Sequence, residues 1–273
     1  MGVKGVYTAL SGAMAQSTKL DTIANNLANV NTPAFKRDQQ LFQEYLTANE
    51  KPPEVIQIPR DVAAIESFYN MQGGDKSYVD TKGTFTDFSQ GGMKHTGNAL
   101  DVAIDGKGFF EVATPGGVRL TRAGNFTLDG NGQLVTKDGH PVLSAGAPGA
   151  DPAARVIRVN GTGAGPLSIA DNGDVFEGTQ NIGKLSLVNV NNPDTLQKVG
   201  SSLYTFKSNS TPDMTNINNP SLKQGFLETS NVNIVQEMTD MIQTNRVFES
   251  TQKAISAYDQ MADKMINVVG KTN

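Results

Sequence analysis

The sequence predicts an α+β protein in which helices at the two ends of the chain pair as a coiled coil and enclose an inserted antiparallel β-rich domain. Three observations support this fold class. Apolar residues recur every seven positions near both termini, and the period changes to two between about Thr81 and Phe226. Hydrophobic residues make up only 37% of the chain and Gly is plentiful, which favours β-structure with many turns.

The N-terminal segment, 1–34, predicts one amphipathic helix. One seven-residue column contains Val6, Ala13, Leu20 and Leu27, and a second contains Val3, Leu10, Ser17 and Ala24. Pro33 disfavours helical geometry at Thr32, so we expect the helix to end near Asn31.

The C-terminal segment, 227–273, predicts a longer helix of the same kind. Its apolar column contains Ile234, Met241, Phe248, Ile255, Ala262 and Val269. Neither Pro nor Gly occurs between Asn231 and Val269, which allows about 57 Å of continuous helix. The column four residues further on is more polar and contains Met238, Asn245, Gln252, Asp259 and Ile266.

Matching heptads at opposite ends of one chain predict that the two helices pair with each other. A narrow, partly polar seam is marginal in water, so we expect other subunits to complete the bundle. The predicted assembly interface comprises Val6, Leu10, Ala13, Leu20, Leu27, Ile234, Met238, Met241, Phe248, Ile255 and Ala262.

The segment 35–80 predicts a short helix and an extended linker. Phe35, Phe42, Tyr45 and Leu46 share a helical face, so we expect a helix to about Asn49. Three prolines between Pro52 and Pro59 stiffen the following linker, and 72–80 is Gly-rich and polar, as in a loop.

The segment 81–226 predicts the β-rich domain. Leu100, Val102 and Ile104 alternate with polar residues, and Asp-Gly and Asn-Gly pairs at 129–132 separate further short strands. Such pairs accept the positive φ angles of hairpin turns, so the pattern is typical of antiparallel sheets.

No residue pattern predicts catalysis, a cofactor or a metal site. His95 and His140 lie in turn-like stretches without a neighbouring nucleophile. Loops beginning at Asp129 and Asp171 lack the Gly and acidic residue that a calcium-binding EF-hand needs, and are better explained as hairpin turns. Asp101 and Asp105, expected on a solvent-facing side, leave a glycosidase pair open, although no other feature supports one.

Composition excludes several function classes. The net charge is −4 and no basic cluster is longer than Lys36-Arg37, so nucleic-acid binding lacks its electrostatic basis. Without cysteine the chain has no disulfides and no thiolate metal sites. We find neither an apolar run of about 18 residues, as a membrane span requires, nor the apolar core of a cleaved signal peptide.

Three blocks resemble the flagellar basal-body rod and hook axial protein family. They are NNLANVNTPAFKR (25–37), the central block of GNALDVAIDGKGFFEV (97–112) and RAGNFTLDGNGQLVTKDGHPVL (122–143), and GFLETSNVNIVQEMTDMIQTNRVFE (225–249). The motif residues singled out are Asn25, Asn26, Asn29, Pro33, Phe35, Ser230 and Asn231. The short polar side chains among them, which are the three asparagines of the first helix with Ser230 and Asn231, suit helix capping or bonds between helices. Simple solvent exposure is the alternative for the asparagines.

The resemblance implies a structural, non-enzymatic subunit without cofactors. Such proteins leave the cytoplasm unfolded through the flagellar type III export apparatus, without a cleaved signal. They assemble in the periplasm with other rod subunits into a helical tube that transmits torque. Their terminal helices line the export channel and the β-rich domain lies outside.

Within the family, the length suits a rod protein rather than a hook protein. The stretch 46–80 does not resemble the Gly- and Gln-rich insert of distal rod proteins, which favours the proximal type. Ala34 stands where the family commonly has Gly. A different class, a secreted β-domain binding protein with coiled-coil ends, is a rival, although six Tyr and no Trp offer little for stacking on sugars.

Overall fold

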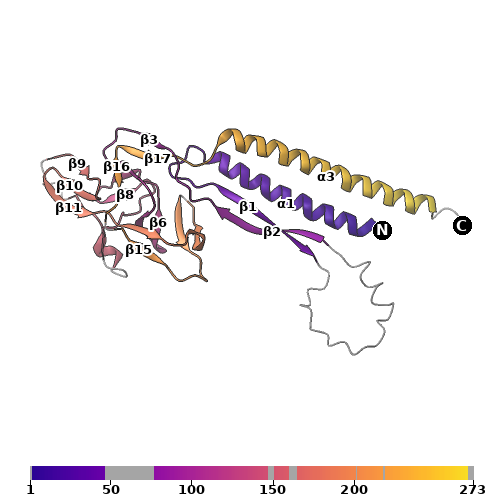
Figure 1. The fold of residues 1–273 in the computed structure, drawn as a ribbon, viewed down its shortest axis with the longest axis horizontal. Coiled ribbons are helices and arrows are strands. Elements are labelled where there is room, and N and C mark those ends of the chain that lie inside the picture. Colours follow the sequence, from indigo (N-terminus) through magenta and orange to yellow (C-terminus); the bar gives the residue numbers. More distant parts are fainter. Residues whose placement is uncertain are drawn as a thin grey trace, which may run out of the picture. The chain divides into compact units, whose positions relative to one another are not determined.

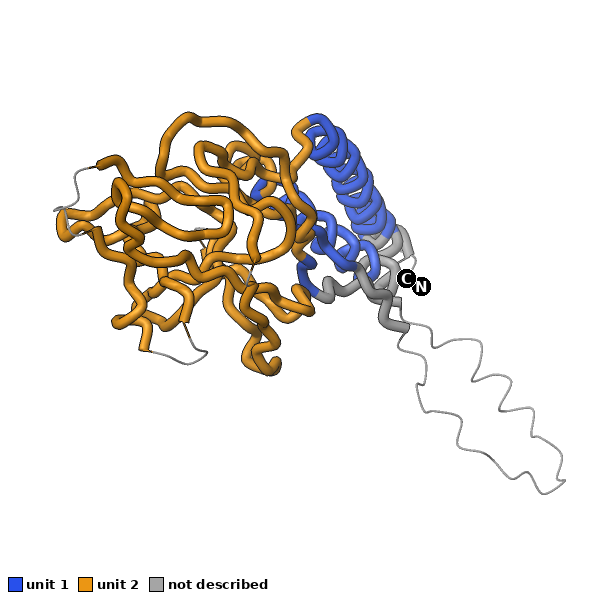
Figure 2. The backbone as a smooth tube through the Cα atoms, turned by 60° about the vertical axis from the view of Figure 1, so that its left-hand side comes forward, with its two compact units in different colours: residues 1–25, 38–85, 235–273 blue, residues 26–37, 86–234 orange. Residues whose placement is uncertain are grey.

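The computed structural model describes residues 2–46, 77–146, 151–159, 165–200, 202–217 and 219–269. Figure 2 colours its two compact units. Unit 1 contains residues 1–25, 38–85 and 235–273, and unit 2 contains residues 26–37 and 86–234. Each unit is assembled from segments far apart in the sequence, so the two ends of the chain share one unit.

Unit 1 holds two long helices and a two-stranded sheet. Helix α1 spans Gly2–Ala28 and helix α3 spans Ile234–Val269. Figure 1 draws them alongside each other, with the start of α1 near the end of α3. Long helices together with many antiparallel strands confirm the α+β class, while a coiled-coil seam between α1 and α3 stays a prediction. Neither helix is long and apolar enough to cross a membrane, within the part of the chain described.

Helix α1 ends three residues earlier than expected. Asn29 and Val30 donate their backbone N–H groups to the carbonyls of Asn26 and Leu27, at 3.2 and 3.3 Å. These bonds span three residues rather than four, and they tighten the last turn of the helix, as is common where carbonyl groups lose their helical partners.

The short helix predicted after Phe35 is wrong. Residues Asp38–Leu46 form strand β1, which pairs with β2, Ser77–Thr86. A short apolar run fits either period, and here a partner strand distant in sequence decides the outcome. Strand β2 also occupies the end of the predicted loop at 72–80. The predicted linker around Pro52 and Pro59 lies outside the described residues.

Unit 2 is built around a six-stranded antiparallel sheet. In spatial order its strands are β13 (Leu196–Lys198), β14 (Leu203–Phe206), β6 (Gly117–Thr121), β5 (Phe109–Thr114), β12 (Leu187–Val190) and β15 (Met214–Asn216). The tight turn between β5 and β6 pairs Thr114 with Gly117, whose φ of 99° suits a residue without a side chain.

Smaller antiparallel sheets surround it. One contains β11 (Gln180–Lys184), β10 (Asp174–Glu177) and β9 (Leu167–Ile169). The two-stranded sheets pair β16 (Leu222–Gln224) with β4 (Val102–Ile104), β17 (Phe226–Glu228) with β3 (Met93–His95), and β7 (Phe126–Leu128) with β8 (Leu134–Thr136). Two 3₁₀ turns span Pro152–Arg155 and Pro193–Thr195.

Strand β5 separates two hydrophobic clusters. Phe110 and Val112 belong to the larger cluster, whereas Phe109 packs with Leu120 and Tyr204 in the smaller one. Side chains alternate between the faces of a strand, so the central sheet is covered on both faces. Strand β4, in a separate sheet with β16, is also buried at all three of its residues. The adjoining Asp101 is buried with it and only Asp105 is exposed, which corrects the expectation that both face solvent.

Candidate functional site

The segment that follows helix α1 and the segment that precedes helix α3 meet within unit 2. They meet at a group of residues that we call the root clamp: Lys36, Arg122, Glu228 and Asn231. The segment 26–37 leads away from α1, and 229–233 leads into α3. Lys36 Nζ donates to Glu228 Oε1 at 2.6 Å and to the Ser89 carbonyl at 2.7 Å. Both side chains are almost completely buried, so this ion pair joins the N-terminal and C-terminal motifs away from water.

Arg122 brings the central block to the same carboxylate. Its Nε donates to Glu228 Oε2 at 2.9 Å, while Nη1 and Nη2 donate to the carbonyls of Gly108 and Gly106, each at 2.8 Å. The backbone N–H of Gly91 also donates to Glu228 Oε1, at 2.9 Å. One carboxylate therefore accepts bonds from three segments that are distant in sequence.

Burial governs the electrostatics of the clamp. Desolvation lowers the pKa of Lys36 below its usual 10.5, and the nearby Arg122 charge lowers it further, while Glu228 acts in the opposite direction. Removing one member of a buried pair leaves an uncompensated charge, which typically costs about 3–5 kcal/mol. The clamp thus fixes which segments meet at the helix roots.

Asn231 connects the same segments through its amide. Its Oδ1 accepts from the Arg37 backbone N–H at 2.7 Å, and its Nδ2 donates to the Asp87 carbonyl at 2.9 Å. Its own backbone N–H donates to the Phe35 carbonyl at 3.3 Å. Only a side chain with both a donor and an acceptor can make these bonds, which explains Asn at this motif position.

The turn before Lys36 is strained at Ala34. Its φ is 54°, in the left-handed region that favours Gly, and its side chain is only 1% exposed. The backbone N–H of Ala34 donates to the Glu228 carbonyl at 2.8 Å, so the strained geometry aligns the segment with β17. The neighbouring Phe35 is buried beneath the Lys198 ammonium, 4.1 Å from the ring centroid.

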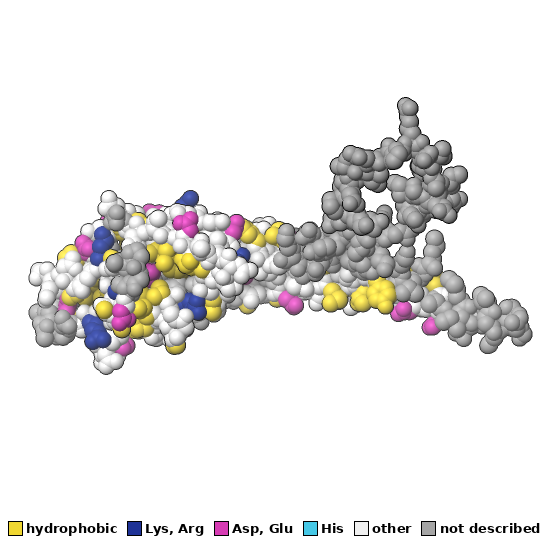
Figure 3. Space-filling model, turned by 90° about the horizontal axis from the view of Figure 1, so that it is seen from below, with side chains coloured by type: hydrophobic (Ala, Val, Ile, Leu, Met, Phe, Trp, Pro, Cys, Tyr) yellow, Lys and Arg dark blue, Asp and Glu magenta, His cyan; other side chains and the backbone are white. Residues whose placement is uncertain are grey.

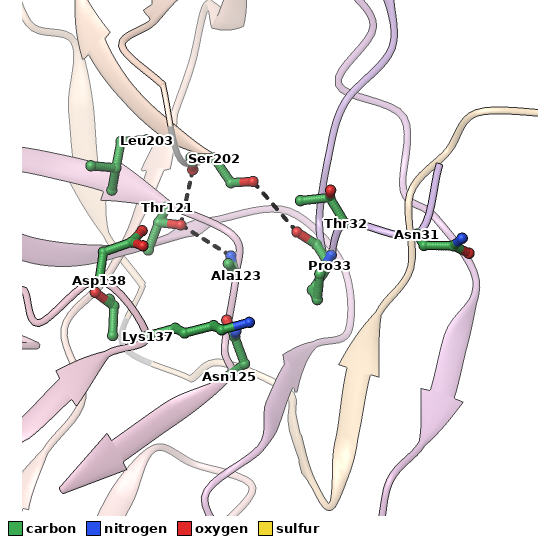
Figure 4. A pocket seen from close by; sticks show the side chains of 11 residues that line it. Asn31, Thr32, Pro33, Thr121, Ala123, Asn125, Lys137, Asp138, Ser202 and Leu203 are labelled. Carbon is green, nitrogen blue, oxygen red and sulfur yellow. Dashed lines mark hydrogen bonds between the residues drawn. The ribbon is translucent and has the colours of Figure 1, made fainter. Parts of the chain in front are cut away.

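A cavity of about 340 Å³ opens beside this turn (Figure 4). Thr32 and Pro33 line one side and Thr121, Lys137 and Ser202 line the other. Ser202 has a φ of 56°, and its Oγ donates to the Pro33 carbonyl at 3.5 Å. Among the described residues, Ala34 and Ser202 are the two non-Gly positions with positive φ, so backbone strain concentrates around Pro33.

The predicted interface residues of the two helices differ in their exposure to solvent. On α1, Ala13 is buried, Leu20 and Leu27 are half-buried, and Leu10 is exposed. On α3, Met241, Phe248 and Ile255 are half-buried, whereas Ile234 and Met238 are exposed. The side chains of Val6 and Ala262 lie outside the described set.

The heptad columns did not include further positions that are buried on the two helices. The structure buries Ile23 on α1 and Glu237 and Thr244 on α3, each three residues beyond or four before an apolar-column position. On a helix surface, a column of residues has neighbours both three and four positions further on. The spacing alone therefore does not decide which neighbouring column is buried. Because Glu237 and Thr244 are polar, the sequence did not indicate that these positions of α3 are buried.

The remaining motif residues have local roles. Asn26 is buried, whereas Asn25 is exposed. Asn29 Oδ1 accepts from the Thr32 hydroxyl at 3.1 Å, and Ser230 Oγ accepts from the Val232 backbone N–H at 3.2 Å. These are the turn and capping bonds that short polar side chains make beside helix ends.

The candidate calcium loops are turns. Asp129 Oδ1 accepts from the backbone N–H groups of Gln133 and Asn131, at 2.7 and 2.9 Å, and these bonds hold the pKa of Asp129 below its usual value. Asn172 Oδ1 accepts from the Asp174 N–H at 3.1 Å. Across the described ranges, no three His, Asp or Glu side chains gather closely enough to hold a metal ion.

Comparisons with known proteins match both ends and the centre of the chain. Residues 6–36 match the family described as flagella basal body rod protein. Residues 103–177 match the flagellar hook protein FlgE/F/G D1 domain, and residues 223–268 match the flagellar basal body rod FlgEFG protein C-terminal. The root clamp lies where the three matches converge, with Lys36, Arg122 and Glu228 each inside a different one.

Curated relatives extend the likeness over nearly the whole chain. The flagellar basal-body rod protein FlgG of Bacillus subtilis is 35% identical, covering 97% of this chain and 99% of its own length. The flagellar basal-body rod protein FlgF of Caulobacter vibrioides is 33% identical over 98% of both chains, and FlgF of Rhizobium meliloti is 34% identical over 97% of this chain and 98% of its own. The chain therefore belongs to the family of flagellar basal-body rod proteins.

Proposed function

We propose that the chain is a structural subunit that assembles helically into the axial shaft of the basal body, transmits torque and surrounds the export channel. On this proposal the subunit is exported unfolded by the flagellar type III apparatus, without a cleaved signal, and joins other rod subunits in the periplasm. Relatives named as rod proteins over their full length support the structural role.

The observation that carries helical assembly is the exposure of large apolar side chains on both helices. Val235 is 74% exposed and Ile242 is 54% exposed on α3, and Leu10 and Met14 are exposed on α1. Figure 3 shows such hydrophobic side chains, in yellow, at the surface. Burying a side chain of this size against a neighbour contributes about 1.5–3 kcal/mol, so repeated contacts of this kind favour a polymer.

The half-buried columns suit a second role. We infer that Ala13, Leu20 and Leu27 of α1 face Met241, Phe248 and Ile255 of α3 in an intramolecular seam. The exposed positions then remain for neighbouring subunits, and load carried by the helices reaches unit 2 through the two chain segments at the root clamp. This division gives inward and outward positions on each helix separate functions.

The test compares adjacent exposed positions on α3, Ile242→Asp and Gln243→Asp. Both residues are exposed, and both variants gain the same charge, but only the first loses an apolar contact surface. In a strain whose own copy is deleted, we expect Ile242→Asp to abolish motility and rods in electron micrographs of purified basal bodies. Gln243→Asp retains both, and purified monomers of the two variants unfold at the same temperature. Intact rods with Ile242→Asp would overturn the proposal.

The position along the rod is a second question. We propose the proximal position, because residues 46–80 do not resemble the Gly- and Gln-rich insert of distal rod proteins. The alternative is a distal rod or hook-type position, since relatives named FlgG are as similar to this chain as those named FlgF. Complementation separates the two. Expression in an flgF deletion strain restores motility on the first assignment, and expression in an flgG deletion strain restores it on the second.

A further inference from the structure

The buried charges of the root clamp do not balance. Lys36 and Arg122 both bond to the single carboxylate of Glu228, and all three side chains are buried. The group therefore carries one more positive than negative charge. A net charge held away from water is unfavourable unless an anion or a polar environment compensates it.

A second cavity, of about 370 Å³, lies beside this excess charge and is lined by Arg122. A guanidinium has five N–H donors, and the bonds to Glu228, Gly108 and Gly106 use three of them. Although Arg122 is only 5% exposed, its other two N–H groups form no further hydrogen bond among the described residues. Its guanidinium carbon also lies 5.9 Å from the centroid of the Phe109 ring. A buried guanidinium with donors to spare matches the planar oxygens of a carboxylate.

Two more donors line the same cavity. Lys107 is exposed on the turn between β4 and β5, and Asn189 is half-buried on β12. Neither side chain bonds to another described residue. The rings of Phe88 and Phe109 form apolar walls, which weaken the competition from water for charged groups.

Of the neighbouring carboxylates, Asp105 has a cationic partner, whereas Asp213 and Asp87 accept from neutral donors and keep their charge. Asp105 forms an ion pair with Lys223 at 2.8 Å, and Asp213 accepts from Asn191 Nδ2 at 2.8 Å. Asp87, on the Lys36 side, accepts from the Ser89 backbone N–H at 2.9 Å. None of these acidic groups lines the cavity, so its charged lining is entirely cationic.

We propose that this cavity is a binding site for a carboxylate, held by Arg122, Lys107 and Asn189. The occupant is either a free small carboxylate or the side chain of an Asp or Glu from a second copy of the chain. The site is independent of the position that the subunit takes in the rod.

Acetate is the probe for the test, titrated into the full chain at constant ionic strength with chloride as the balancing ion. Backbone amide NMR shifts follow the cavity residues. We expect saturable shifts around Gly106 and Gly108, and a dissociation constant at least tenfold weaker in Lys107→Gln. The matched control, Lys94→Gln, removes an exposed lysine on β3 outside the cavity and leaves binding unchanged. Unsaturable shifts, equal effects of the two variants, or binding of phosphate without acetate would overturn the proposal.

A second variant places a carboxylate of the chain itself in the cavity. Asn189→Asp has nearly the same shape and places a carboxylate in the cavity, so we expect it to abolish the acetate response and raise Tm by about 2 °C at low salt. The control Asn172→Asp, at an exposed turn outside the cavity, sets a new charge beside Asp174 and lowers Tm instead. A lower Tm for Asn189→Asp with acetate binding intact would contradict the site.

The concentration of the chain distinguishes the two sources. Acetate binding that is the same from dilute to concentrated protein identifies a free carboxylate as the occupant. Acetate that dissociates concentrated protein, measured by sedimentation, identifies a second copy as the donor. Either result requires the cavity, and both effects must be lost in Asn189→Asp.

Discussion

The helices of unit 1 and the root clamp of unit 2 differ in the kind of interaction that their side chains offer. The clamp is buried, charged and bonded atom by atom, with Glu228 accepting from Lys36, Arg122 and Gly91. The helices present exposed apolar side chains such as Val235 and Met14. Directional bonds specify one arrangement within a chain, whereas apolar faces tolerate the approach of another subunit. We infer that the clamp defines the subunit and the helices serve the assembly.

The largest expected effect comes from removing the carboxylate at the centre of the clamp. Glu228→Ala leaves two buried cations without their partner, so we expect the free energy of unfolding to fall by about 3–5 kcal/mol in urea denaturation. Glu249→Ala on α3 is the control, because its exposed bond to Asn245 contributes about 0.5 kcal/mol or less. A similar small loss in both variants would remove the contrast between clamp and helix.

The strained turn gives the next effect. Ala34→Val places a β-branched side chain in left-handed geometry within a closed site, and we expect a loss of about 2 kcal/mol. Ala34→Gly relieves the strain but loses a buried methyl group, so its stability stays within about 1 kcal/mol of the parent. Thermal unfolding of the parent and the two variants measures their order of stability. A Val variant as stable as the Gly variant would mean that the turn relaxes and is not strained.

Asn231 offers a test of the polar side of the clamp. Asn231→Ala leaves the Arg37 N–H and the Asp87 carbonyl without this partner, which we expect to cost about 2 kcal/mol. Asn209→Ala, at an exposed turn, provides the matched control. Equal unfolding free energies for the two alanine variants would show that water replaces the Asn231 amide.

The smallest effect is a pH dependence that belongs to Lys36. Its pKa is lowered in the folded protein and is about 10.5 in the unfolded chain. Between the two values the unfolded chain binds more protons, so this residue's contribution to stability rises with pH and levels off above about 10.5. The difference in unfolding free energy between the parent and Lys36→Met should rise over that window. A difference that falls with rising pH would mean that Glu228 outweighs desolvation.

Sequence patterns predicted the elements whose periods are long and unbroken. Heptads located α1 and α3, and Asp-Gly and Asn-Gly pairs located turns such as the one at Asp129, because these signals are local. Strand β1 was mistaken for a helix because its pairing with β2 depends on a segment some thirty residues away. Local propensity cannot report such a partner.

The candidate site was predictable only in part. The motifs marked Asn231, but Lys36, Arg122 and Glu228 each look like an ordinary charged residue in the sequence. What makes them a site is burial on one another, across separations of up to 192 residues. Ala34 stands where the family commonly has Gly, and its positive φ is the physical reason for that preference.

Hydrogen–deuterium exchange of the dilute monomer and of the assembled rod tests the central claim most directly. The amides of Ala34 and Gly91, which donate to Glu228 of the clamp, and the amide of Asn231 are bonded within one chain, so we expect them to be protected already in the monomer. Amides of α1 and α3 should exchange rapidly in the monomer and become protected at least tenfold on assembly. Helices that are as protected as the clamp before assembly, or a clamp that gains protection only with it, would contradict the account.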